Sequence, residues 1–190
     1  MQASNDIITK FCSSVENSYD SITTCLEQAV GESLLTHEDN VYRFAHDTVH
    51  QAAYDLMSPE EKGKYHFSIG LRLMSSISKK ATFDALIFTV VDQINNAKRY
   101  GVTEASMSTA CAKLNLQAAK RSMEISDFES AWQYVVYGIA FLPEAKWESP
   151  TYELTLGLYE AGARACFVNA DVENLQMSLE AIFENAVQFE

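Results

Sequence analysis

Apolar side chains recur at helical spacing along most of the chain. In residues 82–99 they follow one another every three or four positions from Phe83 to Ile94, which predicts a helix that is buried on one side. The same spacing predicts further helices over residues 5–35, 46–57, 58–76, 104–123, 128–142, 150–168 and 171–188. The pattern therefore predicts a mostly all-α protein.

Local signals place several boundaries between these helices. Ser58 and Glu61 form a capping box at the start of 58–76, and residues 126–129 form a second one before 128–142. The polar residues 36–40 predict a turn, and Val41-Tyr42-Arg43-Phe44 after it has β preference. We expect a small hairpin or wing strand there.

The last part of the chain contains two helix pairs that are similar to each other, with Asp171 standing where Asp127 stands in the first pair. This part resembles the tetratricopeptide type of helix pair, through Ala119, Ala131, Gly138 and Pro143. We expect a winged-helix-like part over 1–57, connecting helices over 58–102 and TPR-like helical repeats over 103–190.

The periodicity also predicts which side chains are covered. Helix 58–76 is expected to bury Tyr65, Ile69, Leu73 and Ile77, and helix 128–142 a stripe that includes Trp132 and Val136. The last helix is expected to bury Val172, Leu175, Leu179, Ile182, Phe183 and Ala186. Met177, Val187 and Phe189 would stay partly uncovered, so we expect the chain to self-associate or to bind a hydrophobic dye.

Charge narrows the range of partners. The 190 residues carry 14 Lys and Arg against 26 Asp and Glu, a net charge of -12. Residues 1–57 sum to -7, residues 58–124 to +4 and residues 125–190 to -9, which together give -12. An acidic chain does not favour broad binding to nucleic acid or to anionic membranes, so we expect protein partners.

The cysteines and the apolar runs indicate a compartment. Cys12, Cys25, Cys111 and Cys166 are widely spaced, without a CxxC pair, and are expected to be reduced. No signal-peptide pattern and no apolar run of membrane-spanning length stands in the sequence. We expect a cytoplasmic protein.

One constellation of polar residues suggests chemistry. His46-Asp47-x-x-His50 places two imidazoles on one helix face, as a metal pair requires, but no third ligand stands at a telling distance. A helix start with solvated histidines is the simpler interpretation. The aromatic residues from Trp132 to Tyr152 either line a peptide groove or pack in the core, and the core is favoured because Trp132 lies on the apolar stripe.

The segment Tyr42-Arg43-Phe44-Ala45-His46-Asp47-Thr48-Val49-His50-Gln51-Ala52-Ala53-Tyr54 resembles the region after the nucleotide-binding core of STAND-class signalling ATPases. It is most similar to the AAA-type predicted ATPase module of large hybrid serine/threonine–histidine sensor kinases. The resemblance covers about residues 20–190. Its further matching positions are Leu34-Leu35, Leu56, His66, Ile69-Gly70, Gln93-Ile94-Asn95, Leu114-Asn115, Ala118-Ala119, Tyr134, Gly138, Trp147 and Tyr152-Glu153-Leu154.

The resemblance implies a winged helix whose His-Asp dipeptide faces a bound nucleotide. His46 would then contact the diphosphate of ADP and Asp47 would orient it. ATP, ADP and magnesium belong to the parent family, whereas this sequence has no Gly-rich phosphate loop and so no cofactor of its own. The chain would be an inner part of a longer kinase.

Three functions follow from these observations. The first is a non-catalytic regulatory module that couples nucleotide or partner state to kinase domains. The second is a free-standing TPR-like adaptor that binds a peptide or protein. The third is a metal-dependent hydrolase built on His46, Asp47 and His50. We expect the first, and therefore no enzyme activity in this chain.

Overall fold

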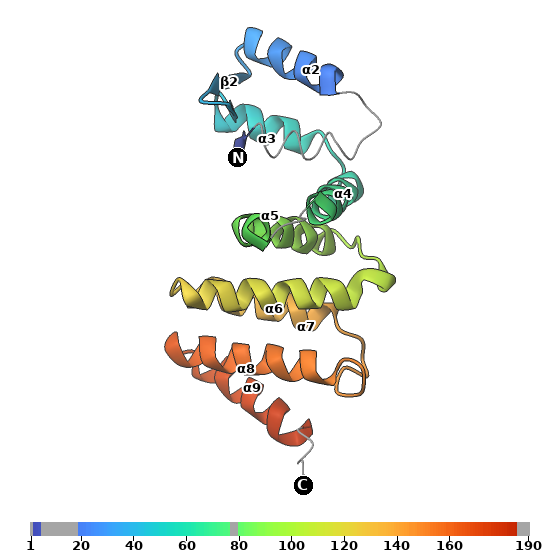
Figure 1. Ribbon diagram of the computed structural model, residues 1–190, viewed down its shortest axis with the longest axis vertical. Coiled ribbons are helices and arrows are strands. Elements are labelled where there is room, and N and C mark those ends of the chain that lie inside the picture. Colours follow the sequence, from blue (N-terminus) through green and yellow to red (C-terminus); the bar gives the residue numbers. More distant parts are fainter. Residues whose placement is uncertain (1, 5–18, 77–79, 186–190) are drawn as a thin grey trace. The chain divides into compact units, whose positions relative to one another are not determined.

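The computed structural model describes residues 2–4, 19–76 and 80–185, and it forms two compact units, Met1–Val102 and Thr103–Glu190. Both are helical, with one small sheet in the first unit (Figure 1). The all-α prediction is confirmed. Two boundaries were expected: the one at 57/58 lies inside the first unit, and the one at 102/103 is where the two units divide.

The small sheet has the order β1-β3-β2 and consists of β1 (Gln2–Ser4), β2 (Leu35–Glu38) and β3 (Val41–Phe44), all antiparallel. Leu35 pairs with Phe44 and Glu38 with Val41. The turn predicted over 36–40 is shorter than expected, because only Asp39 and Asn40 form it, with φ of 50° and 61°. Asp and Asn tolerate positive φ, which a two-residue type I′ hairpin turn requires.

Two helices pack on this hairpin: α2 (Tyr19–Gly31) contacts β2, and α3 (Asp47–Asp55) contacts β3. The helix predicted over 5–35 ends earlier, since Ser33 has a φ of 60° and the Leu34 N–H bonds the Ala29 carbonyl at 2.9 Å. This left-handed end turns the chain into β2. Residues 5–18 of the predicted helix lie outside the described residues.

A helical hairpin completes the first unit, formed by α4 (Pro59–Ser76) and α5 (Lys80–Arg99). The first capping box is confirmed: the Ser58 hydroxyl and N–H donate to Glu61 Oε2 at 2.7 and 2.8 Å, and the Glu61 N–H donates to Ser58 Oγ at 3.3 Å. The expected face of α4 is partly wrong. Tyr65 is 58% exposed, and the buried face runs through His66, Gly70 and Leu73.

In the second unit, residues 103–185 form a short 3₁₀ turn η1 (Ala105–Met107) and four helices. The pairs are α6 (Ser108–Glu124) with α7 (Phe128–Phe141), and α8 (Tyr152–Val168) with α9 (Val172–Asn185); α7 also packs on α8. The predicted helix pairs are confirmed. Their shared core contains Ala119, Ala131, Val135, Ala161 and Ala165, and the small side chains allow close helix approach.

The internal repeat is visible in the two turns within the pairs. Ser126 and Ala170 both have left-handed φ, of 64° and 56°, and each precedes an aspartate that caps the next helix. Asp127 accepts from the Ser130 N–H at 3.0 Å, and Asp171 accepts from the Asn174 N–H at 3.2 Å. The second capping box is therefore corrected: the cap is Asp127, because Ser126 ends the preceding helix.

Candidate functional site

His46 lies at the N-cap position of α3, directly after the sheet. Its backbone is extended, with φ of -144° and ψ of 144°, and its carbonyl accepts the N–H groups of Val49 and His50 at 3.0 and 3.3 Å. The imidazole makes no capping hydrogen bond and is exposed. The side chain is thus presented at a helix N-terminus without a partner among the described residues.

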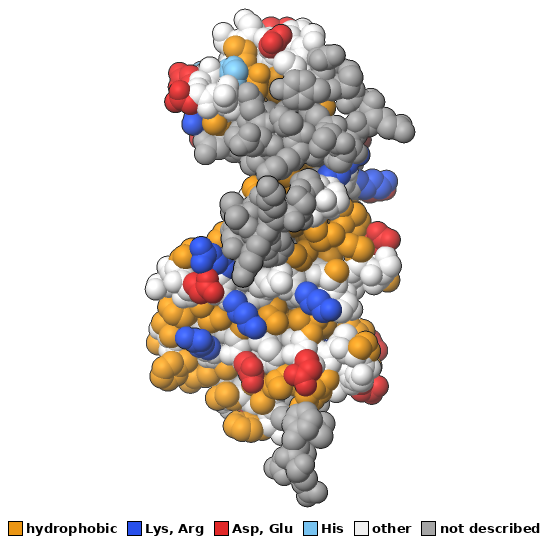
Figure 2. All heavy atoms as spheres, viewed as in Figure 1, with side chains coloured by type: hydrophobic (Ala, Val, Ile, Leu, Met, Phe, Trp, Pro, Cys, Tyr) orange, Lys and Arg blue, Asp and Glu red, His pale blue; other side chains and the backbone are white. Residues whose placement is uncertain are grey.

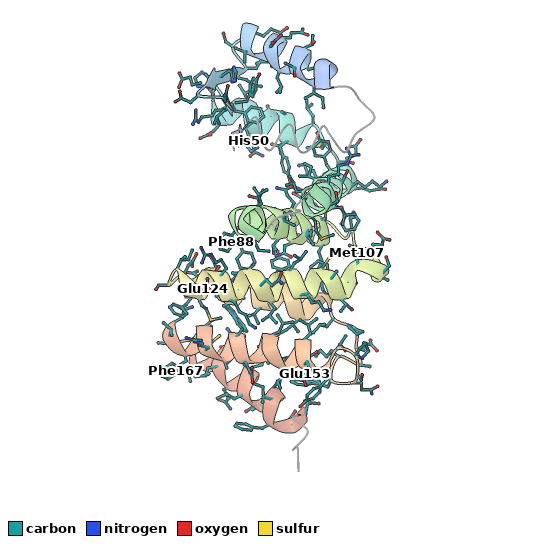
Figure 3. The ribbon with its side chains drawn as sticks, in the orientation of Figure 1. His50, Phe88, Met107, Glu124, Glu153 and Phe167 are labelled. Carbon is teal, nitrogen blue, oxygen red and sulfur yellow. The ribbon has the colours of Figure 1, made fainter. Side chains whose placement is uncertain are left out.

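Asp47 and His50 have different surroundings. Asp47 is exposed in the first turn of α3. His50 is half-buried on the same helix (Figure 3), with its ring centroid 4.9 Å from that of Phe44 and 6.3 Å from that of Tyr54. The structure therefore places His46 and Asp47 at the exposed start of the helix, whereas the His50 ring packs against the rings of Phe44 and Tyr54.

That cluster continues into a chain of hydrogen bonds between α3, α4 and α5. The Tyr54 hydroxyl is 2.9 Å from His66 Nε2 and 2.9 Å from the hydroxyl of Tyr100, which directly follows α5. The other ring nitrogen of the buried His66, Nδ1, lies 2.7 Å from Gln93 Oε1. The His66 and Tyr100 rings stack with an interplanar angle of 4°. We call Tyr54, His66, Gln93 and Tyr100 the tyrosine–histidine cluster.

The bonds of this cluster leave no ring nitrogen of His66 without a hydrogen-bond partner. Because the Gln93 oxygen can only accept, His66 Nδ1 donates to it, and Nε2 of the same ring is hydrogen-bonded to the Tyr54 hydroxyl. The Tyr54 and Tyr100 hydroxyls share a second hydrogen bond. Burial, followed by the hydrogen bond and charge interaction with Tyr100, raises the pKa of Tyr54 to about 12. Tyr54 therefore stays protonated and does not act as a base near neutral pH.

The possible metal ligands and the cysteine thiols are the remaining groups that could carry chemistry. No three His, Cys, Asp or Glu side chains come together in a metal-binding arrangement within the part of the chain that the structure describes. The thiols of Cys111 and Cys166 are buried, and burial raises the pKa of Cys166 to about 11, with the charge of Asp171 adding to it. A thiol in that state is a poor nucleophile.

Sequence reasoning placed His46 and Asp47 but did not connect Tyr54, His66 and Gln93. Their signal lay in the resemblance, since all three belong to its matching positions. In the fold they meet from three helices, so these matching residues hold the first unit together. The metal pair proposed for His46 and His50 finds no third ligand among the described residues.

The surface of α9 differs most from the expectation. Six side chains were expected to be buried, yet Val172 is 70%, Leu179 is 37% and Phe183 is 79% exposed. The covered side of α9 instead carries Ser178, which is buried, and Leu175 and Ile182, which are half-buried. Ala186, Val187 and Phe189 lie outside the described residues. We call Val172, Leu179 and Phe183 the α9 stripe.

Comparison of the chain with protein-family models, curated proteins and solved structures gave no match. Within the described residues, no helix combines the length and apolar composition that crossing a bilayer requires.

Proposed function

We propose that the chain is a non-catalytic regulatory module of a STAND-type signalling ATPase, which couples nucleotide or partner state to the output of a kinase in the cytoplasm. The proposal is supported by the resemblance over residues 42–54 and by the exposed imidazole of His46 at a helix N-terminus, a position that suits a phosphate. Asp47 next to it would orient the contact. The nucleotide and its magnesium would be held by a P-loop domain outside these 190 residues.

Protein binding by the second unit rests on the α9 stripe. Apolar side chains are visible on the surface of the C-terminal helices (Figure 2). Val172, Leu179 and Phe183 lie on one side of α9 at helical spacing. An exposed apolar surface of this kind is typical of an interaction site. A free-standing adaptor could use the same surface. A G-x-x-x-x-G-K-[ST] sequence encoded just upstream in the same transcript would favour the regulatory module over the adaptor.

Charge indicates what covers the stripe. The exposed Glu173, Glu180 and Glu184 form an acidic row on the adjacent face of α9, beside the α9 stripe. A second copy of the chain would bring two such rows into one interface, where like charges repel. The surface instead fits an amphipathic helix with an apolar stripe flanked by Lys or Arg, from a neighbouring domain or a signalling partner.

A pair of designed helical peptides tests this proposal. Both carry the same leucine stripe, flanked by lysines in one peptide and by glutamates in the other, and binding to the 190-residue chain is measured by fluorescence anisotropy. The lysine peptide should bind more tightly, and Phe183→Ser should weaken its binding by about tenfold or more, because a Phe side chain contributes about 1.5–3 kcal/mol when covered.

Ile125→Ser is the matched control, since Ile125 is 56% exposed in the same unit but lies outside the α9 stripe. It should leave the affinity unchanged. Equal binding of both peptides, or equal losses in the two variants, would refute the proposed partner. Concentration-dependent dimerisation that Phe183→Ser abolishes would show that a second copy is the occupant instead.

A further inference from the structure

The segment between α7 and α8 is held in one shape by two buried threonines. The Thr151 hydroxyl lies 3.0 and 3.1 Å from the carbonyl oxygens of Lys146 and Glu148, which share its single proton. The Thr155 hydroxyl is 2.6 Å from the Lys146 carbonyl and 2.9 Å from that of Thr151. Both threonines are at most 5% exposed, so water does not compete for these bonds. The Lys146 carbonyl is thereby fixed, and with it the position of the next residue, Trp147.

Trp147 is the central side chain of this segment. Its ring stacks on that of Tyr159, with centroids 5.2 Å apart and an interplanar angle of 21°. It also meets the Tyr152 ring at 6.1 Å and 62°. The buried Tyr159 holds the Trp147 ring in place. Trp147 and Tyr152 therefore form a preformed aromatic corner, which needs little reordering to receive a ligand.

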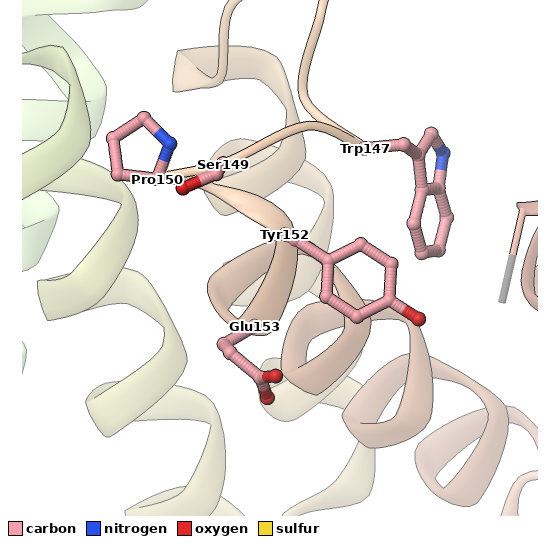
Figure 4. A pocket seen from close by; sticks show the side chains of 5 residues that line it. All are labelled: Trp147, Ser149, Pro150, Tyr152 and Glu153. Atoms are coloured by element: carbon pink, nitrogen blue, oxygen red, sulfur yellow. The ribbon is translucent and has the colours of Figure 1, made fainter. Parts of the chain in front are cut away.

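A hollow of about 340 Å³ opens at this corner (Figure 4). Its lining residues are Trp147, Ser149, Pro150, Tyr152 and Glu153. The volume suits one side chain or a small ligand rather than a folded element. Figure 3 places Glu153 and Phe167 at opposite ends of α8, so the hollow lies at the N-terminal end of that helix, away from Phe167.

The electrostatics of the hollow favour a cation. Glu153 supplies a carboxylate, and no lining residue is basic. Residues 143–153 contain three Glu and one Lys, a net charge of -2, inside a segment 125–190 that carries -9. The faces of the Trp and Tyr rings are also negative, since the aromatic quadrupole concentrates negative potential there. An anionic ligand would meet repulsion from every charged or aromatic group at the hollow.

We propose that this hollow binds the guanidinium group of an arginine side chain from a partner protein. A planar guanidinium stacks on an aromatic face and still directs its N–H groups at a carboxylate, whereas a compact ammonium group stacks less well. Trp147 and Tyr152 would provide the faces and Glu153 the charged acceptor. The inference rests on the hydrogen bonds of Thr151 and Thr155 and on the aromatic corner, and it does not depend on the α9 stripe or on His46.

The test uses two blocked tripeptides, acetyl-Gly-Arg-Gly-amide and its citrulline counterpart, titrated into the 190-residue chain. Citrulline has nearly the shape of arginine but no charge. The indole N–H signal of Trp147, identified by its absence in Trp147→Phe, is followed by NMR. The arginine peptide should shift this signal saturably, and the citrulline peptide should bind at least about fivefold more weakly.

Two variants on α8 complete the experiment. Glu153→Gln should weaken arginine binding by about three- to fivefold, in keeping with a solvent-exposed ion pair. Glu160→Gln removes an exposed carboxylate on the same helix that does not line the hollow, and should leave the affinity unchanged. Equal binding of the two peptides, a shift that never saturates, or the same response in both variants would overturn the proposal.

Discussion

Tyr54 connects α3 to α4 and α5 through a single hydroxyl group. That oxygen is hydrogen-bonded to His66 Nε2 and to the Tyr100 hydroxyl, while Lys62 Nζ lies 4.3 Å from the Tyr54 ring centroid and 3.5 Å from Asp55. The bonds of the buried His66 are made where water competes little, so they contribute more than the Lys62–Asp55 ion pair, whose Asp55 side chain is 58% exposed. At the residue scale, the connection of α3 to α4 and α5 therefore depends on the Tyr54 hydroxyl group.

Tyr54→Phe tests this dependence. The change leaves the buried His66 Nε2 without its hydrogen-bond partner, so the free energy of unfolding at neutral pH should fall by about 1–3 kcal/mol, measured by urea denaturation. Tyr65→Phe alters a residue that is 58% exposed and should stay within about 0.5 kcal/mol of the wild type. A loss of the same size in both variants would contradict the role of the cluster.

The raised pKa of Tyr54 adds a pH dependence with a defined sign. The folded state keeps the proton up to about pH 12, whereas an unfolded tyrosine releases it near pH 10. The stability contributed by the Tyr54 hydroxyl is therefore complete below about pH 10 and is lost as the pH rises towards 12. The difference in unfolding free energy between wild type and Tyr54→Phe should shrink over this interval. A constant difference would contradict the shift.

At the scale of elements, small residues determine how closely the helices of the second unit approach. A Cβ at Gly138 on α7 would stand 2.5 Å from Leu158 Cδ2 and 3.2 Å from Asn115 Cβ. Leu158 and Asn115 are completely buried, on α8 and α6, so neither can move away without shifting its helix. Gly138 is thus a contact point of three helices.

Gly138→Ala should destabilise the protein by about 1–3 kcal/mol, because this overpacking outweighs the roughly 1 kcal/mol by which Ala favours a helix over Gly. Gly31→Ala is the matched control at the end of α2, where nothing lies within 4 Å of the added Cβ. It should be neutral or stabilising by up to about 1 kcal/mol. Denaturation curves of the two variants would contradict the packing argument if Gly138→Ala were the more stable.

At the scale of the whole molecule, the chain divides between Val102 and Thr103. The core formed by Ala119, Ala131, Val135, Ala161 and Ala165 lies entirely within the second unit. Both of its helix pairs also carry their own capping aspartates. The second unit consequently contains the interactions that a folded domain needs.

Residues 103–190 expressed alone should therefore fold. We expect helical circular dichroism and one cooperative thermal transition, which Val135→Ala lowers by removing buried apolar volume from the core. The matched change Val136→Ala, at a side chain that is 42% exposed, should have a much smaller effect. A shortened chain that melts without cooperativity would show that the core of the second unit is insufficient.

The positions of the helices were predictable because their signals are local. Capping at Ser58 needs only the next three residues, and the turn at Asp39–Asn40 needs only residues that tolerate a positive φ. The segment Thr36–Glu38 was misassigned as turn because its polar side chains hide the strand, which exists only through pairing with β3. His46 and Asp47 were placed at a helix start for the same local reason.

The sequence by itself determined that the chain is helical, where most helices begin and end, and which side of each helix is apolar. Only the tertiary structure decided which apolar sides are covered: His66 rather than Tyr65 on α4, and neither Val172 nor Phe183 on α9. Periodicity reports the composition of a helix face, whereas burial depends on whether another element lies against it. The tyrosine–histidine cluster and the aromatic corner at Trp147 join residues from separate elements or from a folded connection, so their contacts arise from packing alone.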